Sequence, residues 1–232
     1  MGHGSGKSQI AASRASRRAL QREQREVNMR KAAASAFEAA HPGYQRVLLV
    51  RHGEAEHNVN WALHRDTPDT RLTARGLQQA DALSHVSAFA ECTLLVVSPL
   101  SRAVETASAI FGERPACRTC LCALHSERRS NGSDVCNQGS PPANLAARFP
   151  FVRAWEGFDE LPDRWWPEAA SDANNSWRAT RLPTFLAWLA AQPQAKVVVV
   201  GHGAYFSDPR MAGRMLSNCE IAVMRGAAGG AR

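Results

Sequence analysis

Short apolar runs that alternate with helical patterns are the feature that most constrains the fold of this chain. We expect strands at Arg46–Val50, Leu94–Val97, Thr119–Ala123, Val197–Val200 and, as a weaker run, Ile221–Met224. We expect helices at Thr73–Ala90, Ser101–Phe111, Pro142–Ala147 and Trp177–Ala191. The first four runs are short and apolar, as strands are when both faces of a sheet are covered. The alternation predicts an α/β fold, a three-layer α/β/α sandwich with a mostly parallel central sheet.

The length and composition allow one sizeable domain. The chain has 232 residues, of which 44% are hydrophobic, and we expect the folded body to span 41–225. Within it, 125–176 is rich in Pro, Gly, Asn and Trp and reads as an irregular insertion. So long an insertion in a compact domain usually shapes a site. We expect 226–232, which is made mostly of Gly and Ala, to be a disordered tail.

Residues 1–40 form a basic block that we expect to be a helical or disordered N-terminal extension. The block holds eight Lys and Arg against three Glu, which accounts for +5 of the net charge of +7. A basic tail is weak evidence for nucleic acid, so we expect no nucleic-acid partner. An Arg-, Ser- and Ala-rich start also suits an organellar transit peptide, although Glu23 and Glu26 weaken that interpretation. We therefore expect a cytoplasmic protein, with an organellar location as the alternative, and no membrane span because no run of eighteen apolar residues exists.

Three of the six cysteines, Cys117, Cys120 and Cys122, are close enough in sequence to suggest a zinc site. No second Cys or His pair lies at zinc-finger spacing. Cys120 and Cys122 also alternate with Leu121 and Ala123, as residues of a buried strand do. We therefore expect reduced, mostly buried thiols, with no metal and no cofactor.

Two predicted strands end in the same way. The strand at Arg46–Val50 continues into Arg51-His52-Gly53, and the strand at Val197–Val200 continues into Gly201-His202-Gly203. In open α/β sheets the ligand crevice lies at the carboxyl ends of the strands, so the two histidines should face each other across it. A third strand leads through Ser98 to Arg102 at the start of a helix, where an anion is favoured.

Four motifs occur in order along the chain, and together they carry a family resemblance. They are Arg51-His52-Gly53-Glu54, Asp69-x-x-Leu72-Thr73-x-x-Gly76-x-x-Gln79-Ala80, Ser98-Pro99-Leu100-x-Arg102-Ala103-x-x-Thr106-Ala107 and Gly201-His202-Gly203. With them the chain resembles the histidine phosphatase superfamily, the group that contains the cofactor-dependent phosphoglycerate mutases. The resemblance covers most of residues 44–225 and implies a phosphoglycerate mutase-like fold.

The resemblance also implies roles for individual residues. His52 resembles the nucleophile that takes a phosphoryl group on a ring nitrogen, which suits a neutral imidazole. Arg51 and Arg102 resemble the guanidinium pair that grips the phosphate, and His202 would complete this clamp. Asn58 matches the position where the mutase-like branch keeps an asparagine that donates to phosphate. No metal is needed where these groups already neutralise the phosphate charge.

Glu127 is our candidate for the general acid that protonates the leaving oxygen. In one branch of the superfamily this acid is an Asp directly after the second histidine, where this chain has Gly203. In the mutase-like branch it is a Glu after the third strand, where Glu127 stands. The alternative is a surface carboxylate paired with Arg128 or Arg129.

These features predict a phosphomonoester hydrolase that acts on a small, anionic, phosphorylated metabolite through a phosphohistidine. Thirty residues follow His202, whereas the family's mutases usually carry a long closing segment there, so a phosphoglycerate mutase-type phosphotransferase is the alternative. A catalytically weak binding module stays open as well, because Gly201 and Gly203 could loosen His202. The substrate's identity and the oligomeric state stay open. Further residues that could ring the pocket are His57, Trp61, His64, Arg65, Arg71, Arg128 and Arg129.

Overall fold

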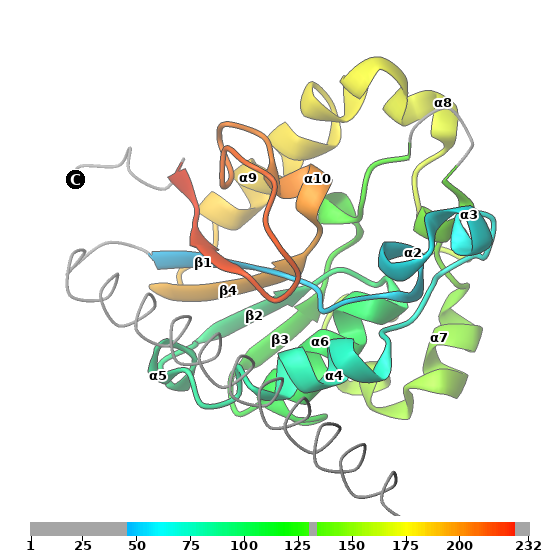
Figure 1. The fold of residues 1–232 in the computed structure, drawn as a ribbon. Coiled ribbons are helices and arrows are strands. Elements are labelled where there is room, and N and C mark those ends of the chain that lie inside the picture. The colour runs from blue at the N-terminus through cyan, green and yellow to red at the C-terminus, as the bar shows by residue number, and fades with distance from the viewer. Residues whose placement is uncertain (1–45, 130–133, 226–232) are drawn as a thin grey trace, which may run out of the picture. The chain divides into compact units, whose positions relative to one another are not determined.

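A five-stranded sheet forms the centre of the computed structural model, which describes residues 46–129 and 134–225 (Figure 1). The strands are β1 (Arg46–Arg51), β2 (Leu94–Val97), β3 (Arg118–Leu121), β4 (Lys196–Gly201) and β5 (Ile221–Val223). Their order in the sheet is β3-β2-β4-β1-β5, and only β5 runs antiparallel to its neighbour. The predicted α/β class with a mostly parallel sheet is therefore confirmed.

Helices cover both faces of this sheet. The helices are α2 (Glu56–Val59), α3 (Trp61–His64), α4 (Ala74–Asp81), α5 (Ser87–Ala90), α6 (Ser101–Phe111), α7 (Pro142–Arg148), α8 (Ala169–Asp172), α9 (Arg181–Ala190) and α10 (Gly203–Phe206). In Figure 1, α9 and α10 lie on one face, and α4 and α6 lie on the other. Within the described ranges, no helix has the length and apolar character needed to cross a bilayer.

The core reflects the two-residue period of the strands. Alternate strand residues such as Leu49, Val96 and Val199 pack with Leu182 and Phe185 of α9. The residues between them in sequence are buried as well, on the face that carries α6. A strand that is buried on both faces reads as a continuous apolar run, and this is why the four runs could be recognised in the sequence.

One predicted helix, Thr73–Ala90, is wrong as a single element. The structure has α4 and α5, separated by a tight turn in which backbone bonds span three residues instead of four. Leu83, Val86 and Phe89 are all buried and are spaced three residues apart. This spacing fits three residues per turn, so burying these three side chains ends the α-helix after Asp81.

The last predicted helix begins later than expected. Trp177 lies in a 3-10 segment, η4 (Ala173–Arg178), and α9 begins only at Arg181. Asn174 and Asn175 have left-handed backbone angles, φ 54° and 61°, which an α-helix cannot contain. Pro183 is tolerated because it lies in the first turn of α9, where its missing N–H has no helical partner to lose.

The described residues of the predicted insertion, 125–129 and 134–176, form short helices joined by turns. Besides α7 and α8 it contains the 3-10 segments η2 (Val135–Asn137) and η3 (Pro150–Ala154), and η1 (Ala123–His125) leads into it. The predicted N-terminal extension and C-terminal tail lie outside the described residues.

Candidate active site

The carboxyl ends of β1, β2 and β4 bring together the groups that the sequence singled out. Arg51 pairs with Gly201 in the parallel register, and the His52 N–H donates to the Gly201 carbonyl (2.9 Å). The rings of His52 and His202 consequently lie with centroids 5.3 Å apart. The expectation that the two histidines would meet at the sheet edge is met.

Two hydrogen bonds define which nitrogen of His52 carries the proton. Nδ1 lies 2.7 Å from the Gly53 carbonyl, which can only accept, so Nδ1 must donate. Arg102 Nε, which can only donate, lies 3.3 Å from His52 Nε2. Both contacts require the same neutral tautomer, with the lone pair on Nε2.

The surroundings of His52 keep the imidazole neutral. Its side chain is buried, and burial, followed by the charges of Arg102 and Arg51, holds its pKa well below the usual value for histidine. A neutral ring with a lone pair on Nε2 beside a guanidinium is a nucleophile next to an anion-binding group.

Arg102, the second residue of α6, is fully buried with its charge. Burial lowers the pKa of this guanidinium from the usual value for arginine. Nη1 donates to the Cys136 carbonyl (2.9 Å) and Nη2 donates to Asn137 Oδ1 (2.7 Å). Buried charge is tolerated only where such hydrogen bonds are made, so the insertion directly supports this arginine.

His202 is held by a residue that we did not assign a role. Its Nε2 lies 2.7 Å from the Ser98 hydroxyl, while Nδ1 is buried and has no hydrogen-bond partner among the described residues. Burial, followed by the charge of Arg102, lowers the pKa of His202 well below its usual value. Nδ1 is thus the ring atom left to face a ligand.

The two glycines that flank His202 are closely packed. A Cβ on Gly201 would lie 2.7 Å from Phe206 Cζ and 3.0 Å from His125 Cδ2. A Cβ on Gly203 would lie 2.7 Å from Met215 Sδ and 3.0 Å from Arg51 Nε. At Gly201 the neighbours are buried rings, so that position needs glycine, whereas at Gly203 the nearest atom belongs to the flexible and exposed side chain of Met215.

Glu127 joins the same cluster of charges. It is buried, and its charge acts on both Arg51 and Arg102. Oε2 accepts from the Ala204 N–H (3.0 Å), and Oε1 accepts from the N–H groups of Tyr205 (3.1 Å) and Arg128 (2.8 Å). The carboxylate therefore caps the start of α10, directly after His202, and the alternative of a surface ion pair does not describe it.

Arg51 and Asn58 are tied to the C-terminal part of the described chain. Arg51 Nη1 donates to the Leu216 carbonyl (2.6 Å), whereas its buried Nε has no partner among the described residues. Asn58 Oδ1 accepts from the Ala55 N–H (3.0 Å) and from Asn218 Nδ2 (3.1 Å). Asn218 also donates to the carbonyls of His52 and Gly53 (3.1 and 3.0 Å), a position-holding role that we did not foresee.

The residues proposed to ring the pocket behave differently from one another. His57 is buried 5.9 Å from the His52 ring, and its Nδ1 contacts the Thr70 hydroxyl at 2.7 Å. Arg71 is instead paired with Glu105 (2.7 Å), and the backbone N–H of Arg129 donates to Asp172 (3.0 Å). Of this group, His57 therefore lies beside the histidine pair, with its ring centroid 5.9 Å from that of His52.

The tryptophans of the insertion pack against the protein. Trp155, Trp165 and Trp166 are all buried, and Trp165 and Trp166 form a cluster with Leu100, two residues before Arg102. These side chains therefore contribute to the packing of the protein interior.

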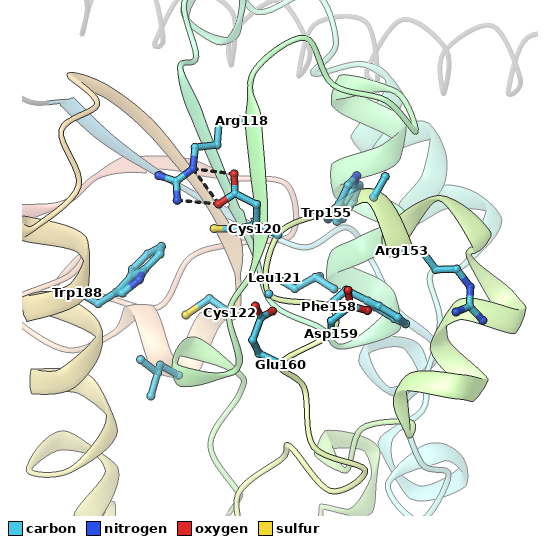
Figure 2. Close-up of a pocket in the computed structure, with 14 residues that line it drawn as sticks. Arg118, Cys120, Leu121, Cys122, Arg153, Trp155, Phe158, Asp159, Glu160 and Trp188 are labelled. Carbon is cyan, nitrogen blue, oxygen red and sulfur yellow. Dashed lines mark hydrogen bonds and ion pairs between the residues drawn. The ribbon is translucent and has the colours of Figure 1, made fainter.

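An open cavity of about 490 Å³ lies apart from this site, beside the outer edge of β3, where Glu156 forms a parallel bridge with Cys120 (Figure 2). Figure 2 shows Trp188 reaching from α9 toward Cys120 and Cys122, and Arg118 paired with Glu156 (2.7 Å). Burial raises the pKa of Cys120 to about 12 and that of Cys122 to about 11, so both are protonated thiols. None of the predicted site residues lines this cavity, and the described residues hold no group of three or more metal-ligating side chains.

The buried histidine pair, flanked by two arginines and a carboxylate at the carboxyl edge of a parallel sheet, has the charge and the donors to bind an anionic group such as phosphate. The model of the histidine phosphatase superfamily (branch 1) matches residues 47–207. The chain therefore belongs to the histidine phosphatase superfamily.

Individual relatives are more distant. An uncharacterized protein of Mycobacterium tuberculosis is 39% identical over 69 residues, which are 30% of this chain and 34% of that protein. Phosphoserine phosphatase from Entamoeba histolytica, solved with 3-phosphoglyceric acid, is 22% identical over 77% of this chain and 89% of its own, with a TM-score of 0.51. Ecdysone phosphate phosphatase from Bombyx mori, solved with tungstate, is 18% identical over 78% and 89%, with a TM-score of 0.53. At these identities the two structures are alike in fold.

Proposed function

We propose that this chain is a phosphomonoester hydrolase that acts on a small phosphorylated metabolite through a phosphohistidine at His52. The observation that carries the proposal is the unprotonated Nε2 of His52, buried and facing Arg102 Nε at 3.3 Å. A neutral imidazole is nucleophilic, and a guanidinium stabilises the charge of the phosphoryl group in transfer. Membership of the histidine phosphatase superfamily supports the same chemistry.

The proposed reaction has two steps. In the first, His52 Nε2 attacks phosphorus, the N–P bond forms, and the P–O bond to the leaving group breaks. The leaving oxygen takes a proton from the Glu127 carboxyl group. In the second, water attacks phosphorus, the N–P bond breaks, and the water proton passes to Glu127. The products are the dephosphorylated alcohol and inorganic phosphate, and the enzyme is unchanged.

The surrounding groups supply positioning in this proposal. Arg51 and Arg102 hold the phosphate oxygens, and His202 donates to them from its unpartnered Nδ1. Asn58, which accepts a hydrogen bond from Asn218, belongs to the same group of phosphate-binding residues.

The test is hydrolysis of an aryl phosphate between pH 5 and 8 by wild type, His52→Ala and His85→Ala. His85 is exposed, so His85→Ala is the matched histidine control. We expect activity in wild type and in the control, and loss of about 10³-fold or more in His52→Ala, because the nucleophile is removed. Inactivity of wild type across this range would instead favour a binding module.

The mutase-type alternative differs in what accepts the phosphoryl group. Enzyme phosphorylated in a single turnover is chased either with water alone or with a phosphoglycerate. We expect release as inorganic phosphate at the same rate in both. Faster transfer to the phosphoglycerate would assign a phosphotransferase. The names of the solved relatives, phosphoserine phosphatase and ecdysone phosphate phosphatase, favour hydrolysis of a small phosphorylated molecule.

A further inference from the structure

The guanidinium of Arg102 presents N–H donors at its outer end and along the edge that carries Nε, and the two ends have different partners. Nη1 and Nη2 donate at their outer end to the Cys136 carbonyl (2.9 Å) and to Asn137 Oδ1 (2.7 Å). Nε donates on the other side, toward His52 Nε2 (3.3 Å). A guanidinium is planar with five N–H donors in a fixed fork. Holding its outer end therefore aims Nε–H and the neighbouring Nη2 hydrogen at the place beside His52 where a phosphate would bind.

Asn137 is itself held so that its oxygen, and not its nitrogen, faces Arg102. Its Nδ2 donates to the Arg128 carbonyl (3.0 Å) and to Asp134 Oδ2 (3.4 Å). A flipped amide would place NH₂ against the guanidinium and oxygen against two acceptors. The side chain is buried, so the loss of any of these bonds would not be replaced by water.

The segment that carries Asn137, residues 134–140, is anchored on Arg65, Asp69 and Trp165. The Cys136 N–H donates to the Arg65 carbonyl (2.9 Å), and Trp165 Nε1 donates to the Ser140 carbonyl (2.8 Å). The Ser140 hydroxyl donates to Asp69 Oδ2 (2.6 Å), and the same carboxylate accepts from Ser101, the residue before Arg102 (2.6 Å). The segment and the start of α6 are thus fixed to one common carboxylate.

We propose that Asn137 is a positioning residue that aims Arg102 at the phosphate held beside His52. The role rests on the proposed function, because it presupposes that Arg102 grips a transferring phosphoryl group. A long arginine side chain has many rotamers, and a donor displaced by about 1 Å can cost a hundredfold in rate. The insertion thereby contributes to catalysis without contacting the substrate.

The experiment compares Asn137→Ala with Gln138→Ala in the full chain, by kcat and KM on an aryl phosphate and by titration with inorganic phosphate. Gln138, the next residue, is half-buried and serves as the control for perturbing the segment. We expect kcat to fall about ten- to hundredfold in Asn137→Ala, with weaker phosphate binding, and Gln138→Ala to stay within about twofold. A rise in activity would show that the segment blocks the site, and would overturn the proposal.

A double-mutant cycle with Arg102→Lys separates positioning from a general structural role. If Asn137 acts through Arg102, adding Asn137→Ala to Arg102→Lys should cost less than about threefold more. Full additivity of the two losses would overturn the positioning role. Full activity of Arg102→Lys alone would instead overturn the clamp in the proposed function, and the role of Asn137 with it.

Asn137→Asp tests the same idea should Asn137→Ala melt below the assay temperature. This variant keeps an acceptor oxygen for Arg102, but its second oxygen replaces the NH₂ group that donates to the Arg128 carbonyl and to Asp134 Oδ2, and it adds a negative charge beside the phosphate. We expect kcat to fall by less than about tenfold, because the acceptor for Arg102 is kept, and KM to rise about tenfold, because the charges repel. A fall in kcat without a rise in KM would contradict the proposal.

Discussion

At the scale of single residues, Gly201 is a position where one added methyl group should cost stability, because buried rings surround it. A Cβ there would lie 2.7 Å from Phe206 Cζ and 3.0 Å from His125 Cδ2, and both rings are fully buried. Neither ring can move without disturbing the core around it. We expect Gly201→Ala to lower the free energy of unfolding by about 1–3 kcal/mol, as overpacking does. Urea denaturation measures this, and an unchanged midpoint would contradict it.

Gly203→Ala should affect activity more than stability. Its Cβ would meet Met215 Sδ at 2.7 Å, the end of a flexible and exposed side chain, and Arg51 Nε at 3.0 Å. Met215 can give way, so we expect less than about 1 kcal/mol of destabilisation. Arg51 can move only by leaving the clamp, so kcat/KM on an aryl phosphate should fall about tenfold.

Adding Met215→Ala to Gly203→Ala identifies which contact matters. The second substitution removes the sulfur but leaves Arg51 in place. We expect no recovery of kcat/KM in the double variant. Recovery to the wild-type value would show that displacement of Arg51 is not the cause.

Gly53 shows how far residue types alone can be interpreted. A glycine directly after His52 is expected to make room for phosphate beside that histidine. In the structure a Cβ there would instead lie 2.5 Å from the Gly76 carbonyl oxygen, so the room is used for backbone packing between the end of β1 and α4. The motif spacing indicated that both glycines matter, but it could not show that they face each other.

At the scale of elements, Asp69 joins three parts of the chain that are distant in sequence. Its carboxylate accepts from the Ser101 N–H (2.7 Å), from the hydroxyls of Ser101 and Ser140 (2.6 Å each), and from Arg148 (3.3 Å). It lies before α4 and ties that region to the start of α6 and to the insertion. Its backbone is left-handed, with φ 49°, a conformation that Asp and Asn tolerate better than most residues.

Substitution of Asp69 should therefore loosen all three parts together. We expect Asp69→Ala to lower the free energy of unfolding by about 2–4 kcal/mol, since buried donors lose their acceptor and alanine is strained at this φ. Asp69→Asn keeps one acceptor oxygen and tolerates the backbone angle, so it should cost about half as much. Thermal melting gives the order, and equal melting temperatures for the two variants would contradict this account.

The elements differ in how well the sequence predicts them, for reasons that particular residues make clear. β2 and α6 have the predicted bounds, because an apolar run and a clear helical period leave few alternatives. The predicted Thr73–Ala90 helix is interrupted where Leu83, Val86 and Phe89 are buried. The burial of these side chains depends on the position of the sheet, which the local sequence pattern does not contain. The anchoring of 134–140 on Arg65, Asp69 and Trp165 depends on tertiary contacts, which no local pattern contains.

The same distinction applies to the site. His52, His202 and Arg102 could be predicted because each follows a recognisable strand, and the parallel order of β1, β4 and β2 brings their ends together. Ser98 belongs to one of the four sequence motifs, but its partner, His202, is distant in sequence and is identified only by the structure. The hydrogen bonds of Asn137 and Asn218 go to residues that are distant in sequence, such as Arg102 and His52. The residue types alone therefore did not indicate that these asparagines belong to the site.

At the scale of the whole molecule, the four histidines that are buried among the described residues should make the fold sensitive to acid. Burial, assisted by nearby arginines, lowers the pKa of His57 to about 2 and that of His125 to about 4, and it lowers the pKa of His52 and His202 well below the usual 6.5. Below pH 6.5 the unfolded chain binds protons at these residues, whereas the folded protein does not. The free energy of unfolding must therefore fall as the pH drops from about 6.5 toward the folded-state values.

His125 allows this contribution to be isolated, because it lies outside the clamp. Its Nε2 donates to the Val200 carbonyl (3.2 Å), and glutamine can supply the same donor without titrating. A shift from 6.5 to about 4 is worth about 3 kcal/mol in full, of which about 2 kcal/mol is lost by pH 5. In His125→Gln the difference in unfolding free energy between pH 7 and pH 5 should therefore be smaller by about 2 kcal/mol. Urea denaturation at the two pH values measures this difference. Exposed His85 is the matched control, so His85→Gln should keep the wild-type difference, and an equal change in both variants would show that burial of His125 is not the cause.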